Sequence, residues 1–463
     1  MAPLLSFYHR LPPVFRHSIA SLRGYYLRHW RYGPETDRLV AEAAERESWP
    51  AERWEAWQAE RLARLLHRAA TRVPYYRDLW QQRRRHGDAR SWEVLRHWPV
   101  LTKEQLRKNP AAFVAVDCNR SRMFVSQTSG TSGTPLRLWQ RRESLRAYYA
   151  LFEARWRKAY GVSRHDRWAI LGGQLVAPVA QRTLPFWVHN RGLHQLYLSA
   201  YHLAPDLIPH YVKAIRDFSP NYIWGYSSSL HTLAQECLRQ GLTGLRFEVV
   251  LTNAEPLYAY QREVIEQAFR SPVRETYGMT EMVAAASECA HGRLHLWPEV
   301  GVLEIHEPDA TGAGDFLCTG LINEDMPLIR YRVGDRGSLG DSSAVCPCGR
   351  TLPLLGRVEG RVDDVLLTPD GRRVGRLDPV FKADLRIREA QVVQEEIDAV
   401  KVLVVPDTCF GERDARELEA RLKERLGGGM RILIQQVDMI PRGPNGKFRA
   451  VVCRIADRPV PCA

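Results

Sequence analysis

The chain of 463 residues is long enough for two or more domains, and its composition, 45% hydrophobic and 26% charged, is that of a globular protein. Its 28 prolines and 32 glycines follow no period, which excludes a collagen-like chain and argues against disorder. The sequence has no run of 18 apolar residues and no signal-peptide pattern, so we expect a cytoplasmic protein without a transmembrane helix.

The net charge of +13 is partly concentrated near the N-terminus, where aromatic residues interleave with Arg10, Arg16, Arg23, Arg28 and Arg31. Such a segment can contact anionic lipid or nucleic acid, or it can be a solvated basic helix, which is the favoured interpretation. No nucleic-acid-binding motif is recognisable, so we expect no nucleic acid partner. A peripheral membrane contact through this basic segment stays open.

The predicted elements begin with a mainly helical part, residues 1–115, in which apolar residues recur at helical spacing. From about 120 to 355, short β-rich runs alternate with helical stretches. This alternation predicts α/β layers around a largely parallel sheet, whose important loops follow the strands. Near residue 360 the pattern changes to a hairpin with an Asp370-Gly371 turn, further strands and a helix that ends at Gly427.

We therefore predict an α/β fold with two domains. The large N-terminal domain (1–360) has α/β layers and a helical N-terminal extension, and it would bind the substrates. The small C-terminal domain (361–463) is α+β and is expected to be a mobile lid. The sequence does not determine the oligomeric state and is compatible with a homodimer.

The strongest local signal is a loop of Ser, Thr and Gly that directly follows the apolar run MFVSQ. Its two glycines let the backbone approach an anion, and its hydroxyl and N–H groups are suitable donors to phosphate oxygens. It lacks the ending of a Walker A motif, and alone it is either a phosphate loop or a flexible linker. The loop consists of Thr128, Ser129, Gly130, Thr131, Ser132, Gly133 and Thr134, followed by Pro135.

Four further motifs follow in chain order. Tyr277-Gly278-Met279-Thr280-Glu281 comes after the predicted strand PVRET, and YRVGDRG (331–337) comes after another. GRVDD (360–364) lies where the pattern changes, and PRGPNGKFR (441–449) lies near the C-terminus. Each has a purely structural explanation when it is taken singly: the Asp of YRVGDRG can cap a turn, and Asn-Gly-Lys is a common hairpin tip.

Together the five ordered motifs resemble the adenylate-forming superfamily of acyl-CoA synthetases, peptide-synthetase adenylation domains and luciferases. The segments GYSSSL (225–230), NAEPL (253–257) and GRVDDVLLTPDGRRV resemble the phenylacetate-CoA ligase family, in its branch of capsule-biosynthesis proteins and deazaflavin-coenzyme synthetases. The similarity spans roughly residues 70–455. It implies an ATP-dependent ligase that activates a carboxylate as an acyl-adenylate and then transfers the acyl group to an acceptor.

The resemblance also implies site residues. The loop 128–134 would hold the ATP phosphates, Glu281 would hold Mg²⁺, and Asp335 would accept hydrogen bonds from the ribose hydroxyls. Lys447 would stabilise charge at the α-phosphate and, with Glu281 and Thr280, form the catalytic set. The loop has Thr134-Pro135 where many relatives have Lys, which bears on pyrophosphate handling. Further nucleotide contacts are expected from Asn253, Ala254, Glu255, Pro256, Glu275, Thr276, Tyr277, Gly278, Met279 and Arg361.

A second set of residues has the pattern of a metal site. The Cys346-Pro-Cys348 segment is a tight two-thiolate clip, and Cys289 with His295 would complete a tetrahedral Cys₃His site for structural Zn²⁺. Relatives in the phenylacetate-CoA ligase family often have such a cluster in this part of the chain. His291 is the competing ligand, and unrelated thiols in a loop are the alternative.

The acceptor is open in the sequence. Coenzyme A is the default that the resemblance implies, whereas an amine or a hydroxyl as acceptor, or transfer of AMP itself, are the alternatives. We expect the small lobe to rotate about a hinge near Asp364 between the two half-reactions. A non-catalytic scaffold of polysaccharide assembly that keeps the fold is the rival interpretation. Trp224 and Tyr226 hint at a flat acyl substrate, although ordinary core aromatics are the favoured explanation for each.

Overall fold

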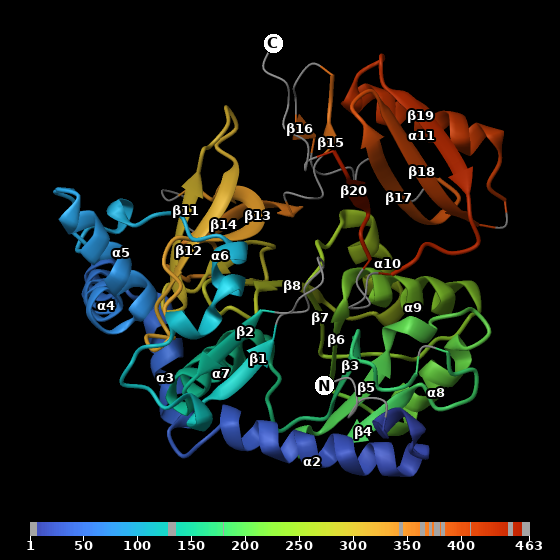
Figure 1. Cartoon of the computed structure of the whole chain (residues 1–463). Helices are drawn as coiled ribbons and strands as arrows, with labels where there is room; N and C mark the ends of the chain where they lie inside the picture. Colours follow the sequence, from blue (N-terminus) through green and yellow to red (C-terminus); the bar gives the residue numbers. More distant parts are fainter. Residues whose placement is uncertain are drawn as a thin grey trace.

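Figure 1 shows a large body of helices around an extended sheet, with a smaller lobe above it formed by the C-terminal residues. The computed structural model describes residues 7–127, 136–178, 180–341, 346–361, 366–369, 373–374, 380, 385–407, 409–442 and 448–455. The expectation of an α/β fold is confirmed. None of the helices in these ranges is both long and apolar enough to span a bilayer.

The N-terminal part is helical, as predicted. The buried faces of these helices join a core with strand residues, since Leu65 and Ala69 pack in the same cluster as Phe316. One helix ends at Arg72 because the residue before Pro74 is extended, as the proline ring requires. The helices are α2 (Pro13–Arg31), α3 (Thr36–Glu45), α4 (Ala51–Arg72), α5 (Pro74–Arg85) and α6 (Lys103–Lys108).

The middle of the chain forms a twelve-stranded sheet in the order β11-β12-β13-β14-β10-β9-β8-β7-β6-β3-β5-β4. Helices alternate with its parallel strands, as the sequence predicts. The parallel strands are β3 (Trp168–Gly172), β5 (Gln195–Ser199), β6 (Tyr222–Tyr226), β7 (Val249–Asn253) and β8 (Val273–Gly278). The helices are α7 (Arg142–Trp156), α8 (Ile208–Phe218), α9 (Ser227–Arg239) and α10 (Ala259–Phe269).

The prediction of a largely parallel sheet is wrong for the other half. Between β8 and β14 the described chain runs from strand to strand without a helical crossover, and the pairings of β9 to β14 are antiparallel. These strands are β9 (Ala285–Glu288), β10 (Leu294–Leu296), β11 (Gly301–His306), β12 (Gly314–Gly320), β13 (Tyr331–Leu339) and β14 (Leu354–Arg361), and β4 (Trp187–Asn190) is antiparallel at the other edge. A separate hairpin joins β1 (Phe124–Gln127) to β2 (Arg137–Gln140).

The C-terminal lobe has its own four-stranded sheet and its own apolar cluster. Helix α11 (Glu412–Leu426) begins after Gly411, and it ends before Gly427, where the sequence predicts its end. The sheet order is β19-β18-β17-β20, formed by β17 (Ile387–Glu396), β18 (Ala399–Pro406), β19 (Arg431–Gln436) and β20 (Val451–Cys453). A small hairpin pairs β15 (Leu366–Leu367) with β16 (Arg373–Val374), and its predicted turn at 370–371 lies outside the described residues. The domain boundary at residue 360 stays a prediction.

Candidate active site

The carboxyl ends of β6, β7 and β8 meet at one edge of the parallel half-sheet. Tyr226 at the end of β6 is in register with Asn253 at the end of β7, and β8 ends beside them at Gly278. In such sheets ligands bind beyond these strand ends. The ends of β7 and β8 and the turns after them carry the predicted nucleotide residues 253–256 and 276–279, and the region beside these residues is called the crevice below.

Position 278 has no room for a side chain, because the backbone of Gly278 lies against the indole of Trp156. A Cβ atom added to Gly278 would lie 2.9 Å from Trp156 Cη2, which is closer than real Cβ contacts allow. Thr276, two residues earlier, donates its hydroxyl to the carbonyl of Thr252 at 2.7 Å. These contacts hold the end of β8 close to β7 and to the body of the molecule.

Tyr277 and Asp335 form a hydrogen-bonded pair in this crevice. The Tyr277 hydroxyl donates to Asp335 Oδ2 at 2.8 Å. Burial, and next the charge of Asp335, raise the pKa of Tyr277 well above its ordinary value, so the phenol keeps the proton that it donates. The pair therefore fixes the orientation of the Asp335 carboxylate.

The prediction that YRVGDRG follows a strand is wrong, since residues 331–339 are themselves strand β13. Gly334 has φ 88, a left-handed backbone that glycine adopts without cost, and it reads as a turn signal in the sequence. Asp335 is paired across the sheet with Arg361, the last residue of β14. A Cβ atom built on Gly360 would lie 3.9 Å from Pro256 Cγ, so the end of β14 meets the turn after β7.

Glu281 is buried in the same region with two partners. Tyr331 donates its hydroxyl to Glu281 Oε1 at 3.2 Å, and Lys103 Nζ lies 3.7 Å from the same oxygen. Lys103 is the first residue of α6, and a bridge between Leu101 and Tyr331 attaches this segment to β13. Sequence reasoning missed Lys103, because no local pattern links it to a carboxylate so far along the chain. Thr280 lies in an exposed turn directly before Glu281.

Glu255 connects the large body to the C-terminal lobe. Its Oε2 accepts the backbone N–H of Ser228 at 3.0 Å, and its Oε1 accepts the backbone N–H of Phe448 at 2.7 Å. Burial raises the pKa of Glu255, while the donated N–H groups act in the opposite direction. The partner residues Ser228 and Phe448 were not among the predicted site residues. Tyr260 of α10 also packs against the core of the lobe.

We expect Glu255→Gln to lower the rate of the first half-reaction by at least about ten-fold, because a hydrogen bond to a charged group contributes about 1.5–3 kcal/mol. Glutamine has one acceptor oxygen and cannot accept both N–H groups. Stopped-flow measurement of adenylate formation checks this, with Glu263→Gln on the exposed side of α10 as the control. If Glu255 served adenine binding alone, the KM for ATP would rise and kcat would stay unchanged.

Several predicted residues lie outside the described part of the chain. These are the loop residues 128–134 with Pro135, Lys447, and the hinge position Asp364. Arg361 is described as part of β14 without its side chain. Among the predicted residues that are described, Met279 packs at the edge of the main core, and Ala254 has a left-handed backbone with φ 64. The side-chain oxygen Oδ1 of Asn253 is buried and has no hydrogen-bond partner within the described residues.

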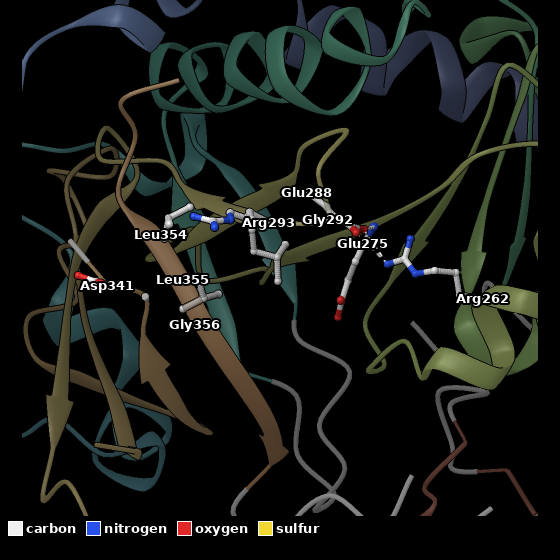
Figure 2. A pocket seen from close by; sticks show the side chains of 11 residues that line it. Arg262, Glu275, Glu288, Gly292, Arg293, Asp341, Leu354, Leu355 and Gly356 are labelled. Carbon is white, nitrogen blue, oxygen red and sulfur yellow. Dashed lines mark hydrogen bonds and ion pairs between the residues drawn. The ribbon is translucent and has the colours of Figure 1, made fainter. Parts of the chain in front are cut away.

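Glu275, a predicted nucleotide contact, lines a cavity of about 410 Å³ between β8, β9 and β14. Figure 2 shows Glu275 on this cavity close to the pair of Arg262 and Glu288. Arg262 donates to both carboxylate oxygens of Glu288 at 2.9 Å, and the backbone N–H of Glu275 donates to Glu288 at 2.6 Å. The structure thus places Glu275 in this charged cavity, whereas Tyr277 on the same strand contacts Asp335.

The predicted metal ligands come together. The ligand atoms of Cys289, His295, Cys346 and Cys348 all lie within 4.8 Å of one another. Cys289 Sγ is 3.6 Å from Cys346 Sγ, close to the separation of about 3.8 Å that two thiolates have on a tetrahedral zinc. The Nδ1 of His295 contacts the carbonyl of Leu352 at 3.2 Å, which directs Nε2 toward Cys348. The competing residue His291 is exposed and lies outside this cluster.

Trp224 is an ordinary core aromatic, which is the explanation that the sequence favours over a substrate contact. It is buried among Phe152, Trp156 and Trp168, with a ring separation of 4.9 Å to the stacked Phe152. Tyr226, two residues further, lies at the crevice, where burial raises its pKa to about 12 and the charge of Glu255 acts in the same direction. Of the two aromatic residues, Tyr226 is the one that lies at the strand ends.

The chain is similar in sequence to known proteins. A family model described as the CapK C-terminal domain matches residues 366–454. Protein CapK of Staphylococcus aureus is 25% identical over 404 residues, covering 86% of this chain and 89% of CapK. A phenylacetate-coenzyme A ligase of Thermus thermophilus is 25% identical over 458 residues, covering 88% of this chain and 98% of that ligase. The chain is therefore similar to phenylacetate-CoA ligases and to CapK over most of its length. The expected class, an AMP-forming ligase, is confirmed by these relatives.

The fold also matches that of a solved CoA ligase. The structure of 2-hydroxyisobutyryl-CoA ligase in the postadenylation state, in complex with R3-HIB-AMP, has a TM-score of 0.67 at 20% identity, covering 89% of this chain and 92% of that one. The same ligase in the thioesterification state has a TM-score of 0.52. The chain as a whole thus superimposes better on the structure of the postadenylation state.

Proposed function

We propose that the protein activates a carboxylate with ATP, releases pyrophosphate, and transfers the acyl group from the acyl-adenylate to coenzyme A. The observation that carries this proposal is the convergence at one crevice of three features. These are the oriented Asp335 carboxylate, the buried Glu281, and the backbone of Phe448 held on Glu255. The last contact brings the residue next to Lys447 against the nucleotide-binding turn.

ATP binding follows from the chemistry of the crevice. The carboxylate of Asp335, fixed by Tyr277, is suited to accept hydrogen bonds from the two ribose hydroxyls. The buried Oδ1 of Asn253 lacks a partner among the described residues, and the exocyclic amino group of adenine is a donor that would satisfy it. The loop 128–134 would bind the β- and γ-phosphates through its hydroxyl and N–H groups.

Glu281 fits a hard cation, since a buried carboxylate is the type of ligand that Mg²⁺ prefers. Lys103 provides the positive charge beside this carboxylate in the structure, and Mg²⁺ bound with ATP would take over that role. When bound, Mg²⁺ neutralises charge on the phosphates of ATP. Lys103 would then be available to contact a phosphate oxygen.

In the first half-reaction a substrate carboxylate oxygen attacks the α-phosphorus of ATP. The new P–O bond forms as the bond to the bridging oxygen of the β-phosphate breaks, and pyrophosphate leaves in line. Lys447 would stabilise the negative charge on the α-phosphate oxygens in this transition state. In the second half-reaction the thiol of coenzyme A loses its proton and attacks the acyl carbon, and AMP leaves. An amine or hydroxyl acceptor is the alternative nucleophile for this second step.

The four residues Cys289, His295, Cys346 and Cys348 would hold a structural Zn²⁺. Three thiolates and one imidazole fill a tetrahedral shell, so this ion would have no open position for a substrate. It would join the turn after β9 to the segment before β14. Its proposed role is therefore stability and not catalysis.

ATP–pyrophosphate exchange with a panel of aliphatic and aromatic carboxylates tests the proposed function. We expect exchange with at least one acid and, after coenzyme A is added, formation of a thioester and stoichiometric AMP. Mass spectrometry of the products separates acyl transfer to coenzyme A, to an amine or to a hydroxyl from transfer of AMP. If no acid supports exchange and Lys447→Ala binds ATP like the wild type, the non-catalytic scaffold is the better interpretation.

We expect Asp335→Asn to raise the KM for ATP about 10- to 100-fold, because hydrogen bonds to a charged acceptor contribute about 1.5–3 kcal/mol each. Asparagine has the same shape but supplies a donor where the ribose needs an acceptor. Exchange rates measured over a range of ATP concentrations give this KM. Tyr277→Phe, which removes only the group that orients Asp335, should raise the KM less. A larger effect of Tyr277→Phe than of Asp335→Asn would contradict the assignment.

A further inference from the structure

The helix α2 exposes an apolar face at the outer surface of the molecule. Figure 1 shows this helix lying along the base of the body, beneath α7 and β4. Leu22 is 69% exposed and Phe15 is 58% exposed, and both point away from the rest of the chain. Exposed apolar residues that gather on one surface mark a contact with a partner or a membrane. The face consists of Val14, Phe15, Ile19, Leu22, Tyr25 and Tyr26.

The opposite face of α2 packs against the body of the protein, so the exposed apolar residues are not the ones that attach the helix to the core. A Cβ atom on Gly24 would lie 1.8 Å from Asn190 Oδ1, which shows how closely the helix approaches β4. Arg16 is buried and donates to Gln181 at 2.7 Å. These contacts fix the orientation of the helix, and in this orientation its exposed apolar residues point away from the body.

Charge determines what can cover this face. The first acidic residue of the sequence is Glu35, so residues 1–34 have five arginines and no carboxylate side chain. Because a helix turns by about 100° per residue, Arg23 and Arg28 flank the apolar face on opposite sides. Both arginines are exposed. A second copy docked through the same face would bring these arginines together, which disfavours a symmetric dimer here.

A cavity of about 400 Å³ continues the basic surface at the C-terminal end of the face. Tyr25 and Arg28 line it together with His29, Tyr32 and Arg164. Arg164 is paired with Asp37 at 2.7 Å. Arg28 has no ion pair within the described residues, so it supplies the uncompensated positive charge at this cavity. Aromatic and cationic groups around a cavity of this size are suited to a lipid headgroup phosphate.

We propose that α2 docks the protein onto an anionic phospholipid bilayer. The helix would lie in the plane of the membrane, with Phe15, Ile19 and Leu22 among the acyl chains and the flanking arginines at the phosphates. Tyr25 and Tyr26 have amphipathic rings that suit the headgroup level. A nucleic acid would use the arginines but would leave the aliphatic side chains without a partner. The protein would thus act at a membrane surface without spanning it.

Cosedimentation of the full chain with vesicles tests the proposal. We expect binding to phosphatidylglycerol-containing vesicles, little binding to pure phosphatidylcholine, and weaker binding as salt is raised. Phe15→Glu with Leu22→Glu should abolish binding, whereas Leu433→Glu should retain it, since Leu433 on β19 is 61% exposed and lies on the C-terminal lobe. Arg23→Glu and Arg28→Glu should each weaken binding at least about five-fold, the effect of one basic residue near an anionic surface.

Measurements of activity and of oligomeric state separate membrane binding from loss of folding and from dimer formation. Each variant should keep wild-type ATP–pyrophosphate exchange and thermal melting, because the substituted residues are exposed and none belongs to the proposed active site. Absence of wild-type binding to anionic vesicles overturns the proposal, as does equal binding by the Phe15→Glu, Leu22→Glu variant. If sedimentation velocity instead shows a dimer that this variant dissociates, the face binds a second copy and the membrane assignment is wrong. A salt-sensitive gel shift without vesicle binding would assign the surface to nucleic acid.

Discussion

Lys447→Ala is expected to slow acyl-adenylate formation about 100- to 1000-fold, the usual effect of removing one charge-stabilising donor from a transition state. The neighbouring Phe448 is held by Glu255 at 2.7 Å, so the chain at this point is fixed beside the nucleotide crevice. The lysine charge would be closest to the α-phosphate when negative charge builds on its oxygens. Single-turnover measurement of adenylate formation gives the rate directly.

The second half-reaction separates this role from a general loss of structure. A synthetic acyl-adenylate supplied to Lys447→Ala should react with coenzyme A at nearly the wild-type rate, because the lobe would present another surface in that step. Lys423→Ala in α11 is the matched control, since Lys423 belongs to the same lobe and is paired with Glu419 at the surface. If both half-reactions fall equally, Lys447 acts through the fold of the lobe and not through charge.

Cys346→Ser combined with Cys348→Ser is expected to remove bound zinc and to lower the free energy of unfolding by roughly 5 kcal/mol or more. Structural zinc contributes about 10–16 kcal/mol in small zinc-binding peptides, and a larger domain retains part of its stability without it. Mass spectrometry of metal content should change from about one zinc per chain to none. Thermal melting should show the loss of stability in the same samples.

Cys409→Ser is the control for this change, because Cys409 is an exposed thiol outside the cluster. It should keep both the zinc and the melting temperature. His291→Ala should also keep the zinc, whereas His295→Ala should lose it, since His295 is buried beside Cys348 and His291 is exposed. Wild-type protein that contains no zinc, purified without chelators, would refute the metal assignment.

The sequence predicted best where local pattern and tertiary environment agree. Strands β3, β6 and β7 are short apolar runs between amphipathic helices, and that alternation determines a parallel arrangement. From β9 to β14 the strands follow one another without helices between them. The sequence of a short β-rich run does not show whether the strand pairs parallel or antiparallel with its neighbour. The YRVGDRG motif misled for a related reason, because a glycine with φ 88 inside a strand has the same sequence signature as a turn.

The site was predictable to the extent that its residues belong to motifs. Tyr277 and Asp335 come from two motifs, and their hydrogen bond agrees with a shared site. Lys103 was missed because its position beside Glu281 depends on the bridge between Leu101 and Tyr331, a long-range contact without a local signal. The choice of His295 over His291 also needed the structure. Both are near Cys289 in sequence, but only His295 lies on β10 facing the thiols.

Strand β14 connects the Cys/His cluster to Asp335, two groups that have separate roles in the proposed function. It begins at Leu354, opposite His295, and it ends at Arg361, opposite Asp335. The proposed metal cluster is thus attached to one end of a single strand, and the carboxylate proposed to bind ribose is attached to the other. In cells that are short of zinc, the end of β14 at Leu354 would lose its support first, so trace-metal supply would limit the amount of folded enzyme before it changes the ATP requirement of the reaction.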